Sequence, residues 1–360
     1  MTLLLQNLPS VPSSAPPLYY TRYHTVVCSV SSSNTDKPRT KPKTTRIKIK
    51  EPDDYHATLK ALNSKGRIPR KALGQHYMLN NDVNEQLVAA ANVGDGDVVL
   101  EIGPGTGSLT NVLVESGANI LAIEKDPYMA TLVTERFAST NRVNVIQEDF
   151  TKCHLRSQMS SFMENNLSNP NPYAKVVANI PFNISSDVVK QLLPMGDIFS
   201  EVVLLLQEET AIRMVDSSLR THEYRPINIF INFYSDPEYK FKVPRENFFP
   251  QPKVDAAVVV FRLKQEVDYP KVSSTKTFFS MVCTFSFYFF NFARSYKFHI
   301  FQVKSAFNGK RKMLRKSLQH ITTSVEIEEA LVNIGLPATS RPEELTLGDF
   351  VKLHNSIEDI

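Results

Sequence analysis

The chain has 360 residues, enough for about two domains with a buried core. Its hydrophobic content of 42%, charged content of 22% and net charge of +4 are those of a soluble globular protein that can accept an anionic partner without requiring one. The cysteines, Cys28, Cys153 and Cys283, are far apart and show no CxxC spacing. This spacing argues against a disulfide framework and against a zinc site, and it favours a reducing compartment.

The first 35 residues contain no Asp or Glu, a single strong base, Arg22, and many Ser, Thr and Pro residues. This composition predicts an organellar transit peptide, and the scarcity of Arg favours the chloroplast, with the mitochondrion as the alternative. A plain disordered tail would look similar. Residues 36–50 hold seven Lys or Arg and one acid, and predict an extended basic linker, either a spacer or an additional contact for nucleic acid. We expect all of 1–50 to be disordered.

Strand and helix patterns alternate from about residue 64 to residue 268. Helices are predicted over 82–93, 108–117, 128–139 and 185–193. Strands are predicted over 97–103, 119–126, 143–150, 174–182, 201–207, 238–244 and 256–263, with a polar loop over 157–172. The alternation predicts the α/β fold class, as a doubly wound, Rossmann-like and mostly parallel sheet over 64–268. Such sheets bind ligands beyond the carboxyl ends of their strands.

After residue 268 the pattern becomes helical. Amphipathic stretches occupy 305–320, 324–337 and 344–357. We therefore expect a small helical C-terminal domain over 269–360.

The stretch VLEIGPGTGSLT, residues 99–110, is a strand that carries Glu101 and ends in a turn with glycines at 103, 105 and 107. Glycine lets the backbone pass close to a ligand because it has no Cβ. A dinucleotide-binding turn has the spacing G-x-G-x-x-G, but here Ser108 occupies its third glycine position. The turn therefore favours S-adenosylmethionine, a nucleoside with an amino-acid tail, over a cofactor with a pyrophosphate. Gly103 and Gly105 are its predicted contacts.

Two further acids end neighbouring strands. Glu124 ends the second predicted strand, where a carboxylate can accept hydrogen bonds from both ribose hydroxyls. Asp149 ends the third, where it can accept a hydrogen bond from the adenine amine of the cofactor. The stretch GQHYMLN, residues 74–80, is expected to close over the methionine part. Acids at strand ends are often merely solvated, but their order beside a glycine turn favours a cofactor site.

The fourth predicted strand leads into NIPF, residues 179–182. The adenine amine is a poor nucleophile because its lone pair is delocalised into the ring. Hydrogen-bond acceptors aimed at its N–H groups stabilise the positive charge that develops on methylation. Asn179, through its side-chain oxygen, and Ile180, through its carbonyl, are the predicted acceptors. Pro181 fixes the turn, and Phe182 offers a face for a flipped base. The alternative is an ordinary strand-end turn with a buried Phe.

These motifs together resemble those of the KsgA-type rRNA adenine dimethyltransferases. The resemblance covers about 64–268 and parts of 305–360, through KALGQHYMLN, EIGPGTGSLT, IEKD, EDF, NIPFNIS, LLLQEETAIRM and FFPQPKVDAAVV. It implies a class I methyltransferase that dimethylates the N6 amines of two adjacent adenosines near the 3′ end of small-subunit rRNA, using S-adenosylmethionine. With the leader, it implies the chloroplast member, a monomer acting on the immature small ribosomal subunit, without a membrane and without a metal.

The resemblance also implies site residues. The family's cofactor contacts map onto His76, Met78, Gly103, Glu124, Asp149 and Asn179. Family members often have Asn and Leu at the first two of these positions, and neither difference is expected to abolish binding. A family aromatic near the target base matches Phe249. The segment 308–318 resembles the family's RNA-facing helix, and residues 207–214 resemble a helix beside the RNA groove.

The predicted phosphate contacts of that RNA-facing helix are Lys310, Arg311, Lys312, Arg315 and Lys316. A solvated helix face is the alternative.

Residues 283–304 do not fit the family pattern. They separate TKTFFSMV from SAFNGKRK, which lie almost next to each other in the family, and they contain nine Phe or Tyr and no acid. The uncharged run Thr277–Ala293 is at the lower limit for a membrane span of about 17–25 residues, and its Ser, Thr and Asn content argues against spanning. Our hypothesis is that the insert is translated non-coding sequence, such as a retained intron.

Two other functions are compatible with parts of the pattern. DNA adenine and protein glutamine methyltransferases use a related Asn-Pro-Pro-Tyr motif, but NIPF with PQPKV favours the rRNA family. Resistance methylases that act on large-subunit rRNA are closer relatives, but the leader favours the small-subunit family. A non-catalytic organellar RNA-binding or transcription factor on the same fold is the alternative from a different class. The presence of Asn179 and of the glycine turn favours an enzyme.

Overall fold

The computed structural model describes residues 69–70, 73–166, 172–221, 224–282, 306–307 and 312–358. These residues belong to one compact unit. The leader and linker at 1–50 and the insert at 283–304 lie outside the described residues, so what the sequence predicts for them stays a prediction.

The secondary structure follows the chain in the order that the sequence predicts for most of its length. The strands are β1 (Tyr77–Met78), β2 (Val98–Ile102), β3 (Asn119–Glu124), β4 (Val143–Gln147), β5 (Ala174–Asn179), β6 (Phe199–Gln207), β7 (Ser235–Val243), β8 (Phe248–Phe249) and β9 (Ala256–Leu263). The helices are α2 (Asn81–Ala90), α3 (Ser108–Glu115), α4 (Pro127–Arg136), α5 (Leu155–Asn166), α6 (Ser185–Leu192), α7 (Glu208–Val215), α8 (Pro226–Tyr234), α9 (Thr275–Val282), α10 (Leu314–Ser317), α11 (Ser324–Asn333) and α12 (Leu347–Glu358).

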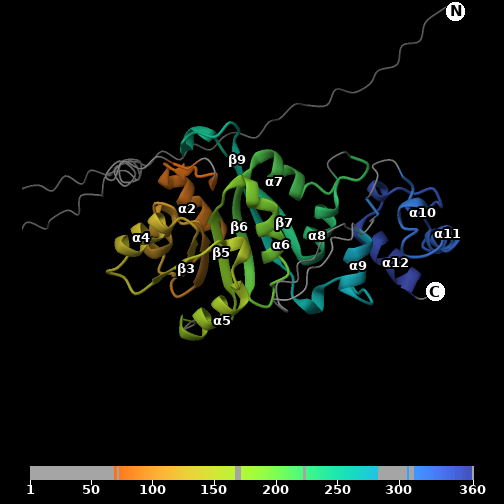
Figure 1. The fold of residues 1–360 in the computed structure, drawn as a ribbon, viewed down its shortest axis with the longest axis horizontal. Coiled ribbons are helices and arrows are strands. Elements are labelled where there is room, and N and C mark those ends of the chain that lie inside the picture. The colour runs from red at the N-terminus through yellow and green to blue at the C-terminus, as the bar shows by residue number, and fades with distance from the viewer. Residues whose placement is uncertain are drawn as a thin grey trace, which may run out of the picture. The chain divides into compact units, whose positions relative to one another are not determined.

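A seven-stranded sheet has the order β4-β3-β2-β5-β6-β9-β7 (Figure 1). The strands from β4 to β6 are parallel, and β9 and β7 are antiparallel to their neighbours. The predicted α/β class and mostly parallel sheet are confirmed. The chain runs outward from β2 to β4 and then returns to the other side of β2 as β5. The strand order therefore reverses between β2 and β5, and α/β sheets bind ligands at such a point.

Helices cover both faces of the sheet because its central strands are apolar on both sides. In β2, Val98, Leu100 and Ile102 belong to one core cluster, and Val99 belongs to a second cluster on the other face. The first cluster includes the buried side chains of α5, α6 and α8, and the second includes those of α2 and α3. This two-sided burial fixes the register of the strands and hence the position of the residues that follow them.

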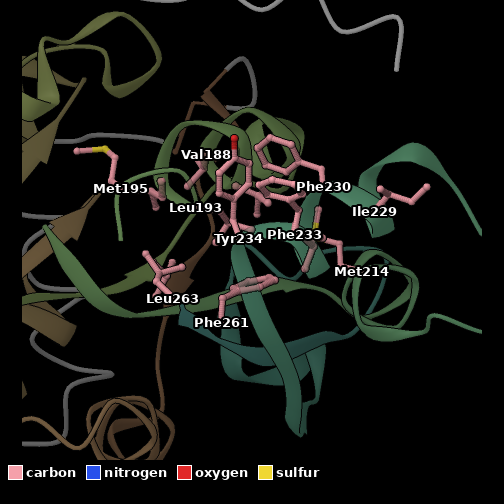
Figure 2. Close-up of a cluster of buried hydrophobic side chains, with 14 of the residues drawn as sticks. Val188, Leu193, Met195, Met214, Ile229, Phe230, Phe233, Tyr234, Phe261 and Leu263 are labelled. Carbon is pink, nitrogen blue, oxygen red and sulfur yellow. The ribbon is translucent and has the colours of Figure 1, made fainter. Parts of the chain in front are cut away.

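An aromatic cluster joins the sheet to the C-terminal helices. Figure 2 shows Phe230, Phe233 and Tyr234 of α8 in one cluster with Phe261 of β9. Phe279 of α9 packs against α8, with its ring centroid 5.0 Å from that of Phe233 and 5.6 Å from that of Tyr234. The same core continues through buried residues of α10, α11 and α12. The C-terminal helices thus share the hydrophobic core of the sheet layer.

In the α/β region, one sequence prediction is wrong, and one further helix has no counterpart among the predictions. Residues 157–172 are predicted as a polar loop, but α5 occupies most of that stretch. Only Leu155, Met159 and Phe162 of α5 are buried, and the polar residues between them mask their helical spacing. The unpredicted helix is α8, PINIFINFY, which is buried on most sides and therefore lacks an amphipathic pattern.

The helices predicted over 324–337 and 344–357 correspond to α11 and α12. Of the helix predicted over 305–320, the described part contains only α10, followed by a turn at 318–320, and residues 308–311 lie outside the described ranges. Within the part of the chain that the structure describes, no helix combines the length and the apolar character needed to cross a membrane.

Replacing Phe279 by Ala is expected to lower the free energy of unfolding by about 3–5 kcal/mol, because a cavity remains between α8 and α9. Val325→Ala on α11 is the control: Val325 is 63% exposed, and its truncation should cost less than about 0.5 kcal/mol. Urea unfolding of the full chain measures the change in unfolding free energy of both variants. Equal effects of the two substitutions would contradict the packing role of Phe279.

Candidate functional site

A pocket lies at the carboxyl ends of β2, β3 and β5, where the strand order reverses. It is closed on one side by the segment around β1 and on another by the turn after β5. The structure brings all the predicted cofactor and catalytic residues into the lining of this pocket, namely His76, Met78, Gly103, Gly105, Glu124, Asp149, Asn179, Ile180, Pro181 and Phe182. Residues more than 100 positions apart in sequence therefore meet at one site, as the predicted topology requires.

The glycine turn connects β2 to α3 and forms the floor of the pocket. Gly103 and Gly105 have φ angles of 68° and 57°, which residues with a side chain rarely adopt. A Cβ on Gly105 would lie 3.0 Å from the ring of Tyr77, so a side chain at this position would require that ring to shift. At Gly103 a Cβ would meet nothing within 4 Å and would project into open space. The turn thus leaves a space beside bare backbone that a ligand can fill.

The carboxylate of Glu124 is held by the backbone on both sides. One oxygen accepts a hydrogen bond from the amide of Gly105 at 3.1 Å, and the other accepts one from the amide of Asp126 at 2.8 Å. Burial raises the pKa of Glu124, and these two hydrogen bonds partly offset the shift. The side chain is therefore fixed in position, and each oxygen keeps a second lone pair for a donor from a ligand.

Asp149 lies at the start of a short 3-10 turn, η2 (Phe150–Lys152), and is more exposed. Its Oδ1 caps that turn by accepting hydrogen bonds from the amide and the hydroxyl of Thr151. Its Oδ2 lies 3.0 Å from the ammonium group of Lys125. Partial burial opposes ionisation, but the hydrogen bonds from Lys125 and Thr151 outweigh it and lower the pKa of the Asp149 carboxyl. Asp149 is thus an ionised acceptor at the edge of the pocket.

Glu101 is a third acid in the lining, and it is 1% exposed. Burial raises its pKa to about 8. A hydrogen bond of 2.7 Å from the hydroxyl of Thr110 favours the charged form and offsets part of this shift. At neutral pH its carboxyl is therefore protonated. Two neighbouring acids of the pocket, Glu101 and Glu124, then do not both carry a charge.

The NIPF turn begins where β5 ends. The amide nitrogen of Asn179 donates to the carbonyl of His76 at 3.5 Å, which leaves the side-chain oxygen of Asn179 as an acceptor. Ile180 is buried and half-buried Phe182 lies against His76, with ring centroids 6.1 Å apart and an interplanar angle of 22°. The turn therefore presents one amide oxygen and one aromatic face at the pocket.

The predicted RNA contacts that the structure describes lie outside the lining of the pocket. Phe249 of β8 is 38% exposed and pairs with Tyr77, which does line it. Lys312 and Lys316 are exposed, whereas Arg315 forms an ion pair of 2.6 Å with Glu328. The other two predicted contacts, Lys310 and Arg311, lie outside the described residues.

Sequence reasoning did not single out several of the lining residues, and three of these make notable contacts. Tyr77 covers the glycine turn, Lys125 pairs with Asp149, and Asn84 of α2 is fully buried. The amide nitrogen of Asn84 donates to Ser108 at 2.6 Å, but its buried Oδ1 has no hydrogen-bond partner among the described residues. An Asn among the apolar positions of the helix predicted over 82–93 was a signal that could have revealed it.

Comparison with known proteins identifies the family. Residues 67–287 match the family described as ribosomal RNA adenine dimethylase. The chain belongs to the ribosomal RNA adenine dimethylase family. Family members are methyltransferases, and the chain is therefore an enzyme, an rRNA adenine dimethyltransferase. The resemblance drawn from the motifs is confirmed.

Several relatives match most of this dimethylase. It is 67% identical over 308 residues to the chloroplastic ribosomal RNA small subunit methyltransferase of Arabidopsis thaliana, covering 85% of this chain and 84% of the relative. It is 32% identical over 296 residues to ribosomal RNA small subunit methyltransferase A of Protochlamydia amoebophila, covering 82% and 94%. The identity to the protein of the same name from Nostoc sp. is 30% over 292 residues, covering 80% and 97%.

Two solved structures share the fold of the dimethylase. The 23S rRNA methyltransferase ErmE matches with a TM-score of 0.54 and 20% identity, covering 78% of this chain and 99% of that one. A dimethyladenosine transferase from Plasmodium falciparum matches with a TM-score of 0.53 and 22% identity, covering 77% and 95%. At these identities the likeness concerns the fold alone, and it confirms the Rossmann-like methyltransferase architecture.

Glu101→Gln is expected to change how the stability of the dimethylase depends on pH. The folded chain holds the Glu101 proton more tightly than the unfolded chain, so this group contributes stability at low pH that is lost as pH rises toward about 8. Gln keeps an acceptor for Thr110 and cannot ionise. The unfolding free energy of the variant, relative to that of the parent, should therefore rise by up to roughly 1.4 kcal/mol per pH unit between pH 5 and 8. Urea unfolding at three pH values tests this, and parallel pH profiles would contradict it.

Proposed function

We propose that the protein uses S-adenosylmethionine to dimethylate the N6 amines of two adjacent adenosines near the 3′ end of small-subunit rRNA, during ribosome biogenesis in the chloroplast stroma. The observation that carries the proposal is the position of Asn179. Its side-chain oxygen is oriented by the hydrogen bond to His76 and lies in the same pocket as the glycine turn and Glu124.

The pocket fits S-adenosylmethionine in three respects. The bare backbone at Gly103 leaves space for a ligand. Glu124 and Asp149 are fixed acceptors at successive strand ends, suited to the ribose hydroxyls and the adenine amine. The unpartnered, buried Oδ1 of Asn84 is a further acceptor at the pocket wall, suited to the ammonium group of the amino-acid tail. When bound, the cofactor supplies an electrophilic methyl group on its sulfonium sulfur.

The residues of the chain act on the adenosine that receives the methyl group. The Oδ1 of Asn179 and the carbonyl of Ile180 accept hydrogen bonds from its amine, which stabilise the positive charge as it develops on nitrogen. Phe182 stacks on the flipped base, with His76 behind its ring. The methylated amine then loses its proton to water, so the site needs no strong general base.

Two observations support the proposals that the substrate is small-subunit rRNA and that the enzyme acts in the chloroplast. The Arabidopsis relative, 67% identical, is named as a chloroplastic small subunit methyltransferase. The acid-free leader has the composition of a plastid transit peptide. Exposed Lys312 and Lys316, with Lys310 and Arg311 outside the described residues, would contact rRNA phosphates on the immature subunit, which the enzyme binds as a monomer.

Asn179→Ala is expected to lower methyl transfer by about 100-fold or more, because one of the two acceptors for the developing charge is lost. Asn144→Ala on β4 is the matched control, since Asn144 is exposed and outside the pocket. The assay uses labelled S-adenosylmethionine and small ribosomal subunits that lack the modification. Label in two adjacent dimethyladenosines with the parent and the control supports the proposal. Full activity of Asn179→Ala would contradict the role proposed for Asn179, and binding to the subunits without methylation by the parent would favour the non-catalytic RNA-binding alternative.

We also propose that the C-terminal helices form an RNA-binding domain over 269–360 and that the insert at 283–304 is dispensable. The amide of Ala306 donates to the carbonyl of Met281 at 2.8 Å, so the chain returns to the end of α9 after the insert. Ala306 is fully buried, and Phe307 packs on Phe350 of α12. Deleting residues 283–303 would place Ala306 four residues after Met281, which is the spacing of an α-helical hydrogen bond.

A chain without residues 283–303 is therefore expected to fold with a melting temperature at or above that of the parent and to keep its methyltransferase activity. Deletion of 283–302 is the matched control, because it removes the same aromatic residues and differs only by keeping Val303, which leaves Ala306 out of helical register with Met281. Thermal unfolding and the methylation assay compare the three chains. A lower melting temperature for the in-register deletion than for the control would show that the insert is part of the fold.

A further inference from the structure

Two segments that are far apart in sequence meet beside the pocket. Strand β1 pairs with β8, with Tyr77 opposite Phe249 and Met78 opposite Phe248. The pairing continues beyond the strands, because the amide of Leu79 donates to the carbonyl of residue 247 at 2.8 Å. We call residues 76–80 and 247–250 together the clasp.

Side chains reinforce the clasp at both ends. At one end, the amide nitrogen of Asn80 donates to the side-chain oxygen of Asn247 at 2.9 Å. At the other end, the Nδ1 of His76 donates to the carbonyl of Pro250 at 2.6 Å, since a carbonyl can only accept. A pair of two-residue strands is not stable by itself in water, so the clasp depends on these side-chain bonds together with the buried side chains of Met78 and Phe248.

The two halves of the clasp face different ligands. The first half contributes His76, Tyr77 and Met78 to the cofactor pocket. The second half carries Phe249, which is 38% exposed and outside that pocket, on the side assigned to the target base. A ligand that fixes one half must therefore favour the position of the other half.

We propose that the clasp couples cofactor binding to rRNA binding, and that Asn80 and Asn247 are positioning residues that transmit this coupling. The inference rests on the proposed function, because it assigns the pocket to the cofactor and Phe249 to the target adenosine. Coupling of this kind is reciprocal. Bound rRNA raises the affinity for the cofactor, and bound cofactor raises the affinity for rRNA by the same factor. Neither Asn lines the pocket, so neither is expected to act by direct contact with the cofactor.

The test measures the dissociation constant of S-adenosylhomocysteine, an unreactive probe, with and without saturating small subunits that lack the modification. In the parent chain the subunits are expected to lower the dissociation constant of the probe by about fivefold or more. Asn247→Ala and Asn80→Ser should each lower that factor by about twofold or more, toward no coupling, while the dissociation constant without subunits stays that of the parent. The Ser substitution keeps an oxygen to cap α2 at the amide of Asp82.

Asn247→Asp is the matched control. It keeps the oxygen that accepts from Asn80 but loses the amide that donates to the carbonyl of Pro244, so it should keep the coupling. The double variant Asn80→Ser with Asn247→Ala should lower the coupling no further than either single variant, because both substitutions remove the same bond between Asn80 and Asn247.

Unchanged coupling in both single variants would overturn the inference, as would a parent chain that methylates rRNA but binds the probe equally well with and without subunits. A parent chain that neither binds the probe nor methylates would instead refute the proposed function, and the inference with it.

Discussion

The parallel pairing of β2 with β3 on one side and β5 on the other is the constraint on which the site depends. Parallel strands bring their carboxyl ends to one edge of the sheet, and the reversal of strand order opens a crevice between them. Glu101, Glu124 and Asn179 all lie at the ends of these three strands. Because the strands are buried on both faces, a shift of one residue in register would exchange the side chains that pack in the two core clusters and displace all three functional side chains.

The same edge concentrates acids, and the structure manages their charges in different ways. Glu101 is buried, and its raised pKa keeps it neutral at neutral pH. Glu124 is held by two backbone amides, and Asp149 is paired with Lys125 and kept ionised. A pocket built in this way can present acceptors to the hydroxyl and amine groups of a nucleoside without charging both of its buried acids, Glu101 and Glu124, which would destabilise the fold.

Much of the fold and of the pocket could be predicted from the sequence, because both depend on local patterns. Apolar runs that end in glycines or acids mark β2 and β3, and topology alone then brings Gly103, Glu124 and Asn179 together. The helix α5 could not be predicted, since its few buried residues are diluted by polar ones, and α8 lacks a polar face. The pairing of β1 with β8 was also beyond sequence reasoning, because strands of two residues carry no periodic signal and their partners are 170 positions apart.

The hydrogen bond between Met281 and Ala306 also makes the end of α9 a natural insertion point. Where a chain leaves a fold and returns through neighbouring backbone groups, a foreign domain can be placed with little strain on the rest of the structure. A fluorescent protein whose own termini lie close together could replace residues 283–303 there. Such a fusion would leave the N-terminus of the chain free, and it would allow the proposed chloroplast location of the enzyme to be followed by fluorescence.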